Sequence, residues 1–195
     1  MIKRPTLLAN VPTNNSKFVP WFAFKILRLL NWNIVGELPN SPKFILVVAP
    51  HTSNWDFFYG LLVKFSLDLK VNFLGKDSIF IWPLSLCLRS AGGIAINRRS
   101  ANGVVGQLVT EFANKQQLVL AMAPEGTRSK VSKWKTGFLH IAKAAKVKVI
   151  PVQMDFANKQ VVFLPARAIV NDIEQELIAL QGLFHKDCAK KPQNF

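Results

Sequence analysis

The amino-acid sequence predicts an α/β fold, with a largely parallel central sheet flanked by helices in a single domain that also carries an N-terminal amphipathic helix. Three observations lead to this prediction. Short apolar runs, many of them β-branched, recur along the chain as they do in buried strands. Longer stretches with helical periodicity alternate with these runs, which is the pattern of a parallel sheet covered by helices. The 195 residues suffice for one domain with a sizeable core.

The elements follow one another from the N-terminus. Residues 1–17 are rich in proline and asparagine and are predicted to be irregular. Strands are predicted at 44–49, 71–75, 93–97, 118–123, 147–152 and 161–164. Helices are predicted at 18–32, 55–67, 78–90, 101–115, 133–145 and 172–184. Asp172 is the expected N-cap of the last helix. The chain is therefore divided into an N-terminal segment (1–36), an α/β domain (37–185) and a basic, proline-containing tail (186–195) that is expected to fray.

The helix predicted at 18–32 is almost entirely apolar apart from one narrow polar stripe, formed by Lys17, Lys25, Arg28 and Asn31. Fifteen helical residues extend roughly 22 Å, which is short of the ~30 Å hydrocarbon core of a bilayer. The helix is therefore not expected to span a membrane. It could lie in the membrane interface, with the stripe toward the headgroups and its tryptophans at the boundary. The alternative is a core helix packed on the sheet.

The net charge of the chain indicates which kinds of binding partner it favours. The net charge of +14 predicts an anionic partner, such as a membrane surface or an acidic carrier protein. Nucleic acid is disfavoured because no nucleic-acid-binding motif accompanies the charge. The alternative is a basic surface that is merely solvated.

The chain has two cysteines that lie far apart in the sequence, and it shows no secretory signal, so a cytoplasmic protein is predicted. Together with the basic charge and the helix at 18–32, this predicts a protein that is peripheral on the cytoplasmic face of the membrane. Cys87, within the apolar run 79–88, is predicted to be buried. That run could line an apolar groove, dip into the membrane or belong to the core.

His51 and Asp56 follow directly after the strand predicted at 44–49. On a continuous helix five positions separate two side chains by about 140°. The pair can meet only if His51 precedes the helix and Asp56 lies in its first turn, with Ser53 or Asn54 as the N-cap. The carboxylate could then accept the Nδ1 proton and leave Nε2 free as a general base. The alternative is a histidine that only packs in a turn.

A second polar segment, 124–128, follows the strand predicted at 118–123. Gly126 allows the backbone to approach a ligand closely. Thr127 and the local N–H groups can donate to phosphate oxygens, and Arg128 can bind them in a bidentate manner. Glu125 could orient Arg128 or bond to an acceptor hydroxyl. The alternative is a structural Glu–Arg pair that fixes the loop.

These segments should converge, since ligands in open α/β sheets bind outside the carboxyl ends of the strands. His51, Arg98 and Glu125 follow the first, third and fourth predicted strands and are expected at one edge of the sheet. A metal site built from His51, Asp56 and Glu125 is disfavoured because the sequence has no paired-histidine spacing, and no metal is predicted.

The motifs resemble those of the glycerophospholipid acyltransferase family, which includes 1-acylglycerol-3-phosphate acyltransferases, over roughly residues 44–165. Four blocks occur in the family's order, at 51–56, 93–98, 124–129 and 149–152. Lys76 matches a lysine often found between the first two blocks. The sequence departs from the family at Pro50, Asn97 and Ala123, where the family usually has asparagine, aspartate and an aromatic residue. These departures leave the acceptor open.

The resemblance implies an O-acyltransferase that moves a fatty acyl group from an acyl thioester to the hydroxyl of a lysophospholipid, most commonly 1-acylglycerol-3-phosphate. It makes His51 the general base and Asp56 the residue that orients it. It implies that the substrate phosphate is bound by Lys76, Arg98, Glu125, Gly126, Thr127 and Arg128. It implies no cofactor, with acyl-CoA or acyl carrier protein as the thioester co-substrate. The alternatives are another lysophospholipid or aminolipid acceptor, and a non-catalytic phosphate- or lipid-binding module.

Overall fold

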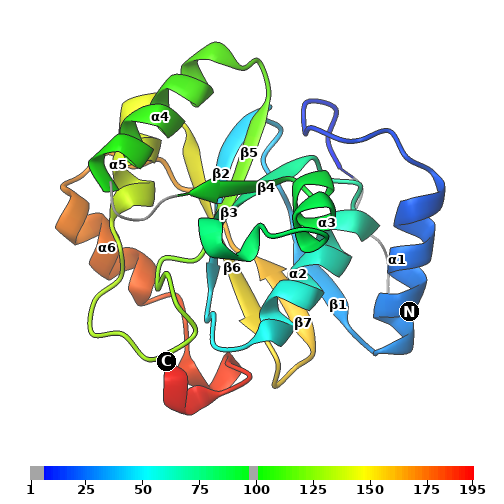
Figure 1. Cartoon of the computed structure of the whole chain (residues 1–195). Coiled ribbons are helices and arrows are strands. Elements are labelled where there is room, and N and C mark those ends of the chain that lie inside the picture. Colours follow the sequence, from blue (N-terminus) through cyan, green and yellow to red (C-terminus); the bar gives the residue numbers. More distant parts are fainter. Residues whose placement is uncertain (1–6, 97–100) are drawn as a thin grey trace.

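The structure is a computed structural model that describes residues 7–96 and 101–195. A seven-stranded sheet with the order β1-β7-β6-β2-β5-β3-β4 runs through these residues (Figure 1). The strands are β1 (Asn33–Gly36), β2 (Lys43–Ala49), β3 (Val71–Lys76), β4 (Gly93–Ile96), β5 (Leu118–Met122), β6 (Lys148–Asp155) and β7 (Gln160–Phe163). β1 has no counterpart among the predicted strands, because it has only four residues and no apolar run.

Neighbouring strands are parallel except for β6 and β7, which confirms the predicted largely parallel sheet. β2 lies between β5 and β6, with Phe44 opposite Val119 and Lys148. β7 turns back antiparallel to β6, and β1 continues in the direction of β7. The carboxyl ends of β2 to β6 therefore meet at one edge of the sheet.

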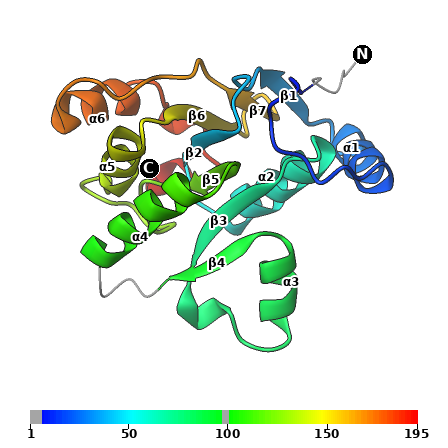
Figure 2. The same ribbon diagram turned by 90° about the horizontal axis from the view of Figure 1, so that it is seen from above.

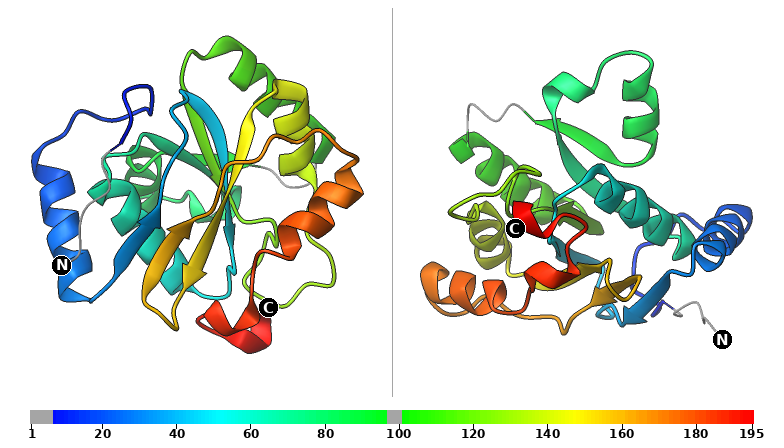
Figure 3. Two further views of the ribbon diagram at one scale, coloured as in Figure 1. Left: turned by 180° about the vertical axis from the view of Figure 1, so that it is seen from behind. Right: turned by 90° about the horizontal axis from the view of Figure 1, so that it is seen from below.

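Two hydrophobic cores lie on opposite faces of this sheet, as the layers in Figures 2 and 3 show. The side chains of β2 alternate between them, as expected for a strand. Phe44 and Leu46 belong to the core beneath α1 and α2, whereas Ile45 and Val47 belong to the core beneath α4, α5 and α6. Burial on both faces explains the continuous apolar run of this strand.

The helices mostly begin and end near the predicted positions. They are α1 (Phe18–Leu29), α2 (Asn54–Ser66), α3 (Leu84–Ser90), α4 (Ala101–Asn114), α5 (Gly137–Ala145) and α6 (Ile173–Gln181), with short 3-10 turns η1 (Asp77–Ile79), η2 (Lys186–Cys188) and η3 (Pro192–Asn194). Asp172 caps α6 by accepting the N–H of Glu174, as predicted. The expected fraying of the tail is not what the structure shows, since the carbonyl of Cys188 in η2 accepts the N–H of Phe156 and the ring of Phe195 packs on Trp134.

The helix predicted at 78–90 is divided in two. Residues 77–79 form η1, and α3 begins only after Pro83, which has no N–H to donate and restricts the residue before it. Most of the run lies outside the core: Ile81 is 64% exposed and Trp82 is 80% exposed, whereas Leu88 at its end is buried. The predicted burial of Cys87 is wrong, since its side chain is also exposed.

α1 packs on α2 through one face and presents apolar side chains on the other. Pro20, Ala23 and Leu27 are buried, at the spacing of a helical stripe. The exposed face carries the side chains of Phe18, Val19, Trp21, Phe22 and Leu29. Trp32, predicted within the helix, lies beyond its end and stacks on Tyr59 in the core, with ring centroids 3.8 Å apart. Among the helices of the described residues, none has the length and apolarity needed to cross a membrane.

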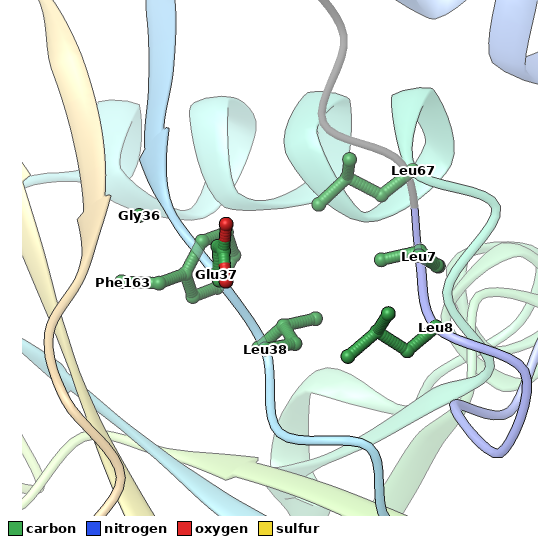
Figure 4. A pocket seen from close by; sticks show the side chains of 7 residues that line it. All are labelled: Leu7, Leu8, Gly36, Glu37, Leu38, Leu67 and Phe163. Atoms are coloured by element: carbon green, nitrogen blue, oxygen red, sulfur yellow. The ribbon is translucent and has the colours of Figure 1, made fainter.

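A small cavity of about 80 Å³ lies beside the far end of α2 (Figure 4). It is lined by Leu7, Leu8, Gly36, Glu37, Leu38, Leu67 and Phe163. Leu67 follows the C-terminus of α2, whereas His51 precedes its N-terminus. The thirteen residues of α2 extend roughly 20 Å between the two ends. This cavity is therefore separate from the edge where the predicted catalytic residues lie.

Candidate active site

The segment between β2 and α2 brings His51 and Asp56 together in the predicted way. His51 precedes the helix, Ser53 is its N-cap, and Asp56 lies in its first turn. The Ser53 side chain accepts the N–H of Trp55, and Asp56 accepts the N–H of Ser53, which completes a capping box. The cap that starts the helix therefore also fixes the carboxylate beside the histidine.

Nδ1 of His51 lies 3.4 Å from Oδ2 of Asp56. That separation exceeds an optimal N–H···O hydrogen bond, and catalytic hydrogen bonds are often long before substrate binds. The same Oδ2 accepts the N–H groups of Thr52 and Ser53, each at 2.6 Å, so the carboxylate has little freedom to turn away. The side chain of Asp56 is 1% exposed and that of His51 is 19% exposed. The acid is buried and the imidazole is accessible, with Nε2 on the side of the ring away from Asp56.

Glu125 lies in the loop just after β5, and its side chain accepts a hydrogen bond from the backbone of His51. Its Oε1 and Oε2 accept the N–H of His51 at 3.1 and 2.8 Å. The contact follows from the topology, because β2 and β5 are parallel neighbours. Burial raises the pKa of Glu125 to about 8, and the charge of Asp56 adds to this rise, while the bond from the His51 N–H opposes it. Among the described residues, the carboxyl group thus bonds to the backbone of His51 rather than to Arg128, and the predicted bond to an acceptor hydroxyl stays a prediction.

The loop after Glu125 presents cations at the same edge. Thr127 and Arg128 are exposed, and Gly126 has a φ of 68°, a conformation that favours glycine. Lys135 returns to this loop: its N–H donates to the carbonyl of Pro124 at 2.8 Å. Its side chain lies across Gly126, where an added Cβ would come within 3.0 Å of Nζ. Sequence reasoning missed Lys135; the only signal was the dense basic stretch around it.

For one predicted residue the structure describes only the backbone, and another lies outside the described residues. Lys76 ends β3, whose neighbour β5 is parallel to it, so its backbone lies at the same sheet edge as Glu125. Arg98 lies outside the described residues. In the described part of the chain, no three His, Cys, Asp or Glu side chains are grouped so as to hold a metal ion. The structure therefore brings together His51, Asp56 and Glu125, with Gly126, Thr127 and Arg128 in the adjoining loop.

The edge of this α/β sheet carries a buried carboxylate beside an accessible histidine, with a Glu-Gly-Thr-Arg loop next to them. The chain belongs to the acyltransferase family: residues 34–155, more than half of its length, match the family model described as Acyltransferase. Both the His51–Asp56 segment and the Glu125 loop lie within the matched region.

Curated relatives carry the description 1-acyl-sn-glycerol-3-phosphate acyltransferase. The protein from Escherichia coli is 37% identical over 60% of this chain and 49% of its own length. The protein from Streptococcus pneumoniae is 29% identical over 65% of this chain and 50% of its own length. The protein from Haemophilus influenzae is 26% identical over 72% of this chain and 61% of its own length. The chain thus spans about half the length of the curated relatives it matches.

Among solved structures, the crystal structure of the 1-acyl-sn-glycerophosphate (LPA) acyltransferase PlsC from Thermotoga maritima resembles this fold. The match has a TM-score of 0.61 and 18% sequence identity, and it covers 85% of this chain and 74% of the other. At this identity the likeness shows a shared fold.

Proposed function

We propose that the chain transfers a fatty acyl group from an acyl thioester to the hydroxyl of a lysophospholipid, with 1-acylglycerol-3-phosphate as the first candidate acceptor. The observation that carries the proposal is the His51–Asp56 pair, with Nδ1 and Oδ2 3.4 Å apart at the sheet edge where Glu125 binds the His51 N–H. A module that only bound lipid or phosphate would have no need of a buried carboxylate behind an accessible imidazole. The family of the chain and the descriptions of its relatives support the same chemistry.

In the proposed reaction, Nε2 of His51 removes the proton of the acceptor hydroxyl as the oxygen attacks the thioester carbonyl. The new C–O bond forms, the C–S bond breaks, and the released thiolate takes the proton from the imidazolium. Asp56 fixes the tautomer of His51 and stabilises the imidazolium. The acceptor phosphate would be bound by the positive charges of Lys76, Arg98, Arg128 and Lys135. The hydroxyl of Thr127 would donate a hydrogen bond to it. The thioester is carried on coenzyme A or on acyl carrier protein.

An acceptor panel tests this function. The whole chain would be supplied with one labelled acyl thioester and, in turn, lysophosphatidate, other lysophospholipids and aminolipids. We expect labelled phosphatidate from lysophosphatidate and a weaker product from acceptors that lack a terminal phosphate, because cations adjoin the site. Transfer to an aminolipid alone would reassign the acceptor. No transfer to any of them, from either thioester carrier, would leave the binding module as the better description.

We further propose that the protein is peripheral on the cytoplasmic face of a membrane. The outer face of α1 exposes Phe18, Trp21, Phe22 and Leu29, and the basic residues Lys17, Lys25 and Arg28 of the same stretch are also exposed. Aromatic, apolar and cationic side chains together are typical of a surface that lies in the headgroup region of an anionic bilayer. The segment 79–86, with Ile81 and Trp82 exposed, supplies further apolar surface.

Replacing Trp21, Phe22 and Leu29 of α1 together with serine should weaken sedimentation with anionic vesicles by at least about 10-fold, because each buried large apolar side chain contributes roughly 1.5–3 kcal/mol. The matched control replaces Val170 and Ile178, which are also exposed but lie on or beside α6, and should sediment like wild type. Equal loss in both variants, or in neither, would refute the role of α1.

A further inference from the structure

The tail of the chain contacts the catalytic segment directly. The N–H of Lys191 donates to Oγ1 of Thr52 at 3.2 Å, and Nδ2 of Asn194 donates to the carbonyl oxygen of Thr52 at 3.4 Å. Thr52 is 2% exposed and stands between His51 and Ser53. Residues 191–194 lie outside the part of the chain that matches the acyltransferase family. The sequence alone does not predict these contacts, because 139 and 142 positions separate the partners.

Both ends of the tail are anchored to the sheet edge. Before the contact, the carbonyl of Cys188 accepts the N–H of Phe156, which directly follows β6, at 2.8 Å. After it, the ring of Phe195 packs on Trp134 with centroids 6.4 Å apart, and Trp134 belongs to the small core that contains Ala49 at the end of β2. Figures 1 and 3 show η2 and η3 at the end of the sheet where β2 and β6 finish.

The polar groups around His51 are thus held from two sides. Glu125 holds the N–H of His51, and Asp56 holds the N–H of Thr52. The tail donates hydrogen bonds to the other two polar groups of Thr52, which are its hydroxyl and its carbonyl oxygen. We infer that residues 189–195 form a clamp that fixes the catalytic segment, with Thr52 and Asn194 as positioning residues for His51. The inference rests on the proposed function, because it gives His51 the role of general base.

Paired variants test the clamp. Thr52→Val keeps the shape of the side chain but removes the acceptor for the Lys191 N–H, whereas Thr52→Ser retains the hydroxyl. Asn194→Ala removes the donor to the Thr52 carbonyl, whereas Gln193→Ala changes an exposed neighbour in the same turn. We expect kcat to fall about 10-fold in Thr52→Val and Asn194→Ala, with the KM for the acceptor unchanged, because a displaced base slows the chemical step without altering acceptor binding. Thr52→Ser and Gln193→Ala should match wild type.

Amide hydrogen exchange in residues 49–56 supplies a readout that does not depend on activity. Exchange of this segment should be faster in Thr52→Val and Asn194→Ala than in their matched controls, because opening the clamp exposes the amides of His51 to Ser53. Wild-type exchange in both variants would overturn the clamp, as would wild-type kcat in both. If wild type itself transferred no acyl group, the proposed function would fail, and the exchange data would still decide whether the tail holds this segment.

Discussion

Replacing His51 with alanine should lower kcat by about 10²–10⁴-fold, the usual contribution of a positioned general base. The fold should survive, because the histidine side chain is partly exposed and the capping box of α2 is built by Ser53 and Asp56. The measurement is the initial rate of acyl transfer to lysophosphatidate, with circular dichroism to confirm folding. His140→Ala is the matched control, since it removes an exposed histidine of α5. Equal rates in wild type and His51→Ala would remove His51 from the mechanism.

Asp56 needs a different experiment because it has two functions. Its carboxylate faces Nδ1 of His51 and also accepts the N–H groups of Thr52 and Ser53. A loss of rate in Asp56→Asn could therefore come from the chemistry or from the helix cap. Residues that act as one unit are not additive, so if the lost rate comes only from the partnership with His51, the double variant His51→Ala/Asp56→Asn should be no slower than His51→Ala alone. A slower double variant would assign the additional loss to the helix cap.

The sequence predicted the features that depend on neighbouring residues. The five positions between His51 and Asp56 required a loop followed by a helix start, and the structure has Ser53 as the N-cap at that point. The apolar runs of the central strands predicted a sheet buried on both faces, and the strands on both sides of β2 are parallel to it. These signals are local in the chain, so one sequence suffices to detect them.

The features that the sequence did not predict depend on distant residues or on weak local signals. Glu125 was expected to orient Arg128, three positions away, or to bond to an acceptor hydroxyl, whereas in the described residues it accepts the N–H of His51, 74 positions away. Lys135 lies in a loop and Asn194 lies in η3, and neither residue belongs to a motif. Trp32 was included in the helix predicted at 18–32 because it continues the apolar pattern, yet α1 ends at Leu29 and the ring packs on Tyr59. Tertiary packing, which periodicity does not report, decided each of these cases.

Replacing Glu125 with glutamine should make the folded protein's stability less dependent on pH. Burial raises the pKa of Glu125 from 4.5 to about 8 in the folded protein. Between these values the folded chain retains a proton that the unfolded chain has lost, so raising the pH favours unfolding. The stability associated with the protonated carboxyl is fully present below pH 4.5 and is lost as the pH rises to about 8. Glutamine has nearly the same shape, can still accept the His51 N–H and does not titrate.

The test is the free energy of unfolding in urea for wild type and Glu125→Gln at several pH values from 5 to 9. The advantage of the variant over wild type should grow with pH by up to about 1.4 kcal/mol per unit and level off above pH 8. Glu111→Gln is the matched control, because Glu111 is half exposed and pairs with Lys115, and its difference from wild type should stay nearly constant. A constant difference for Glu125→Gln would mean that the carboxylate is already charged at neutral pH. A growing difference would mean that the N–H of His51 is held by a largely neutral Glu125 carboxyl group at neutral pH.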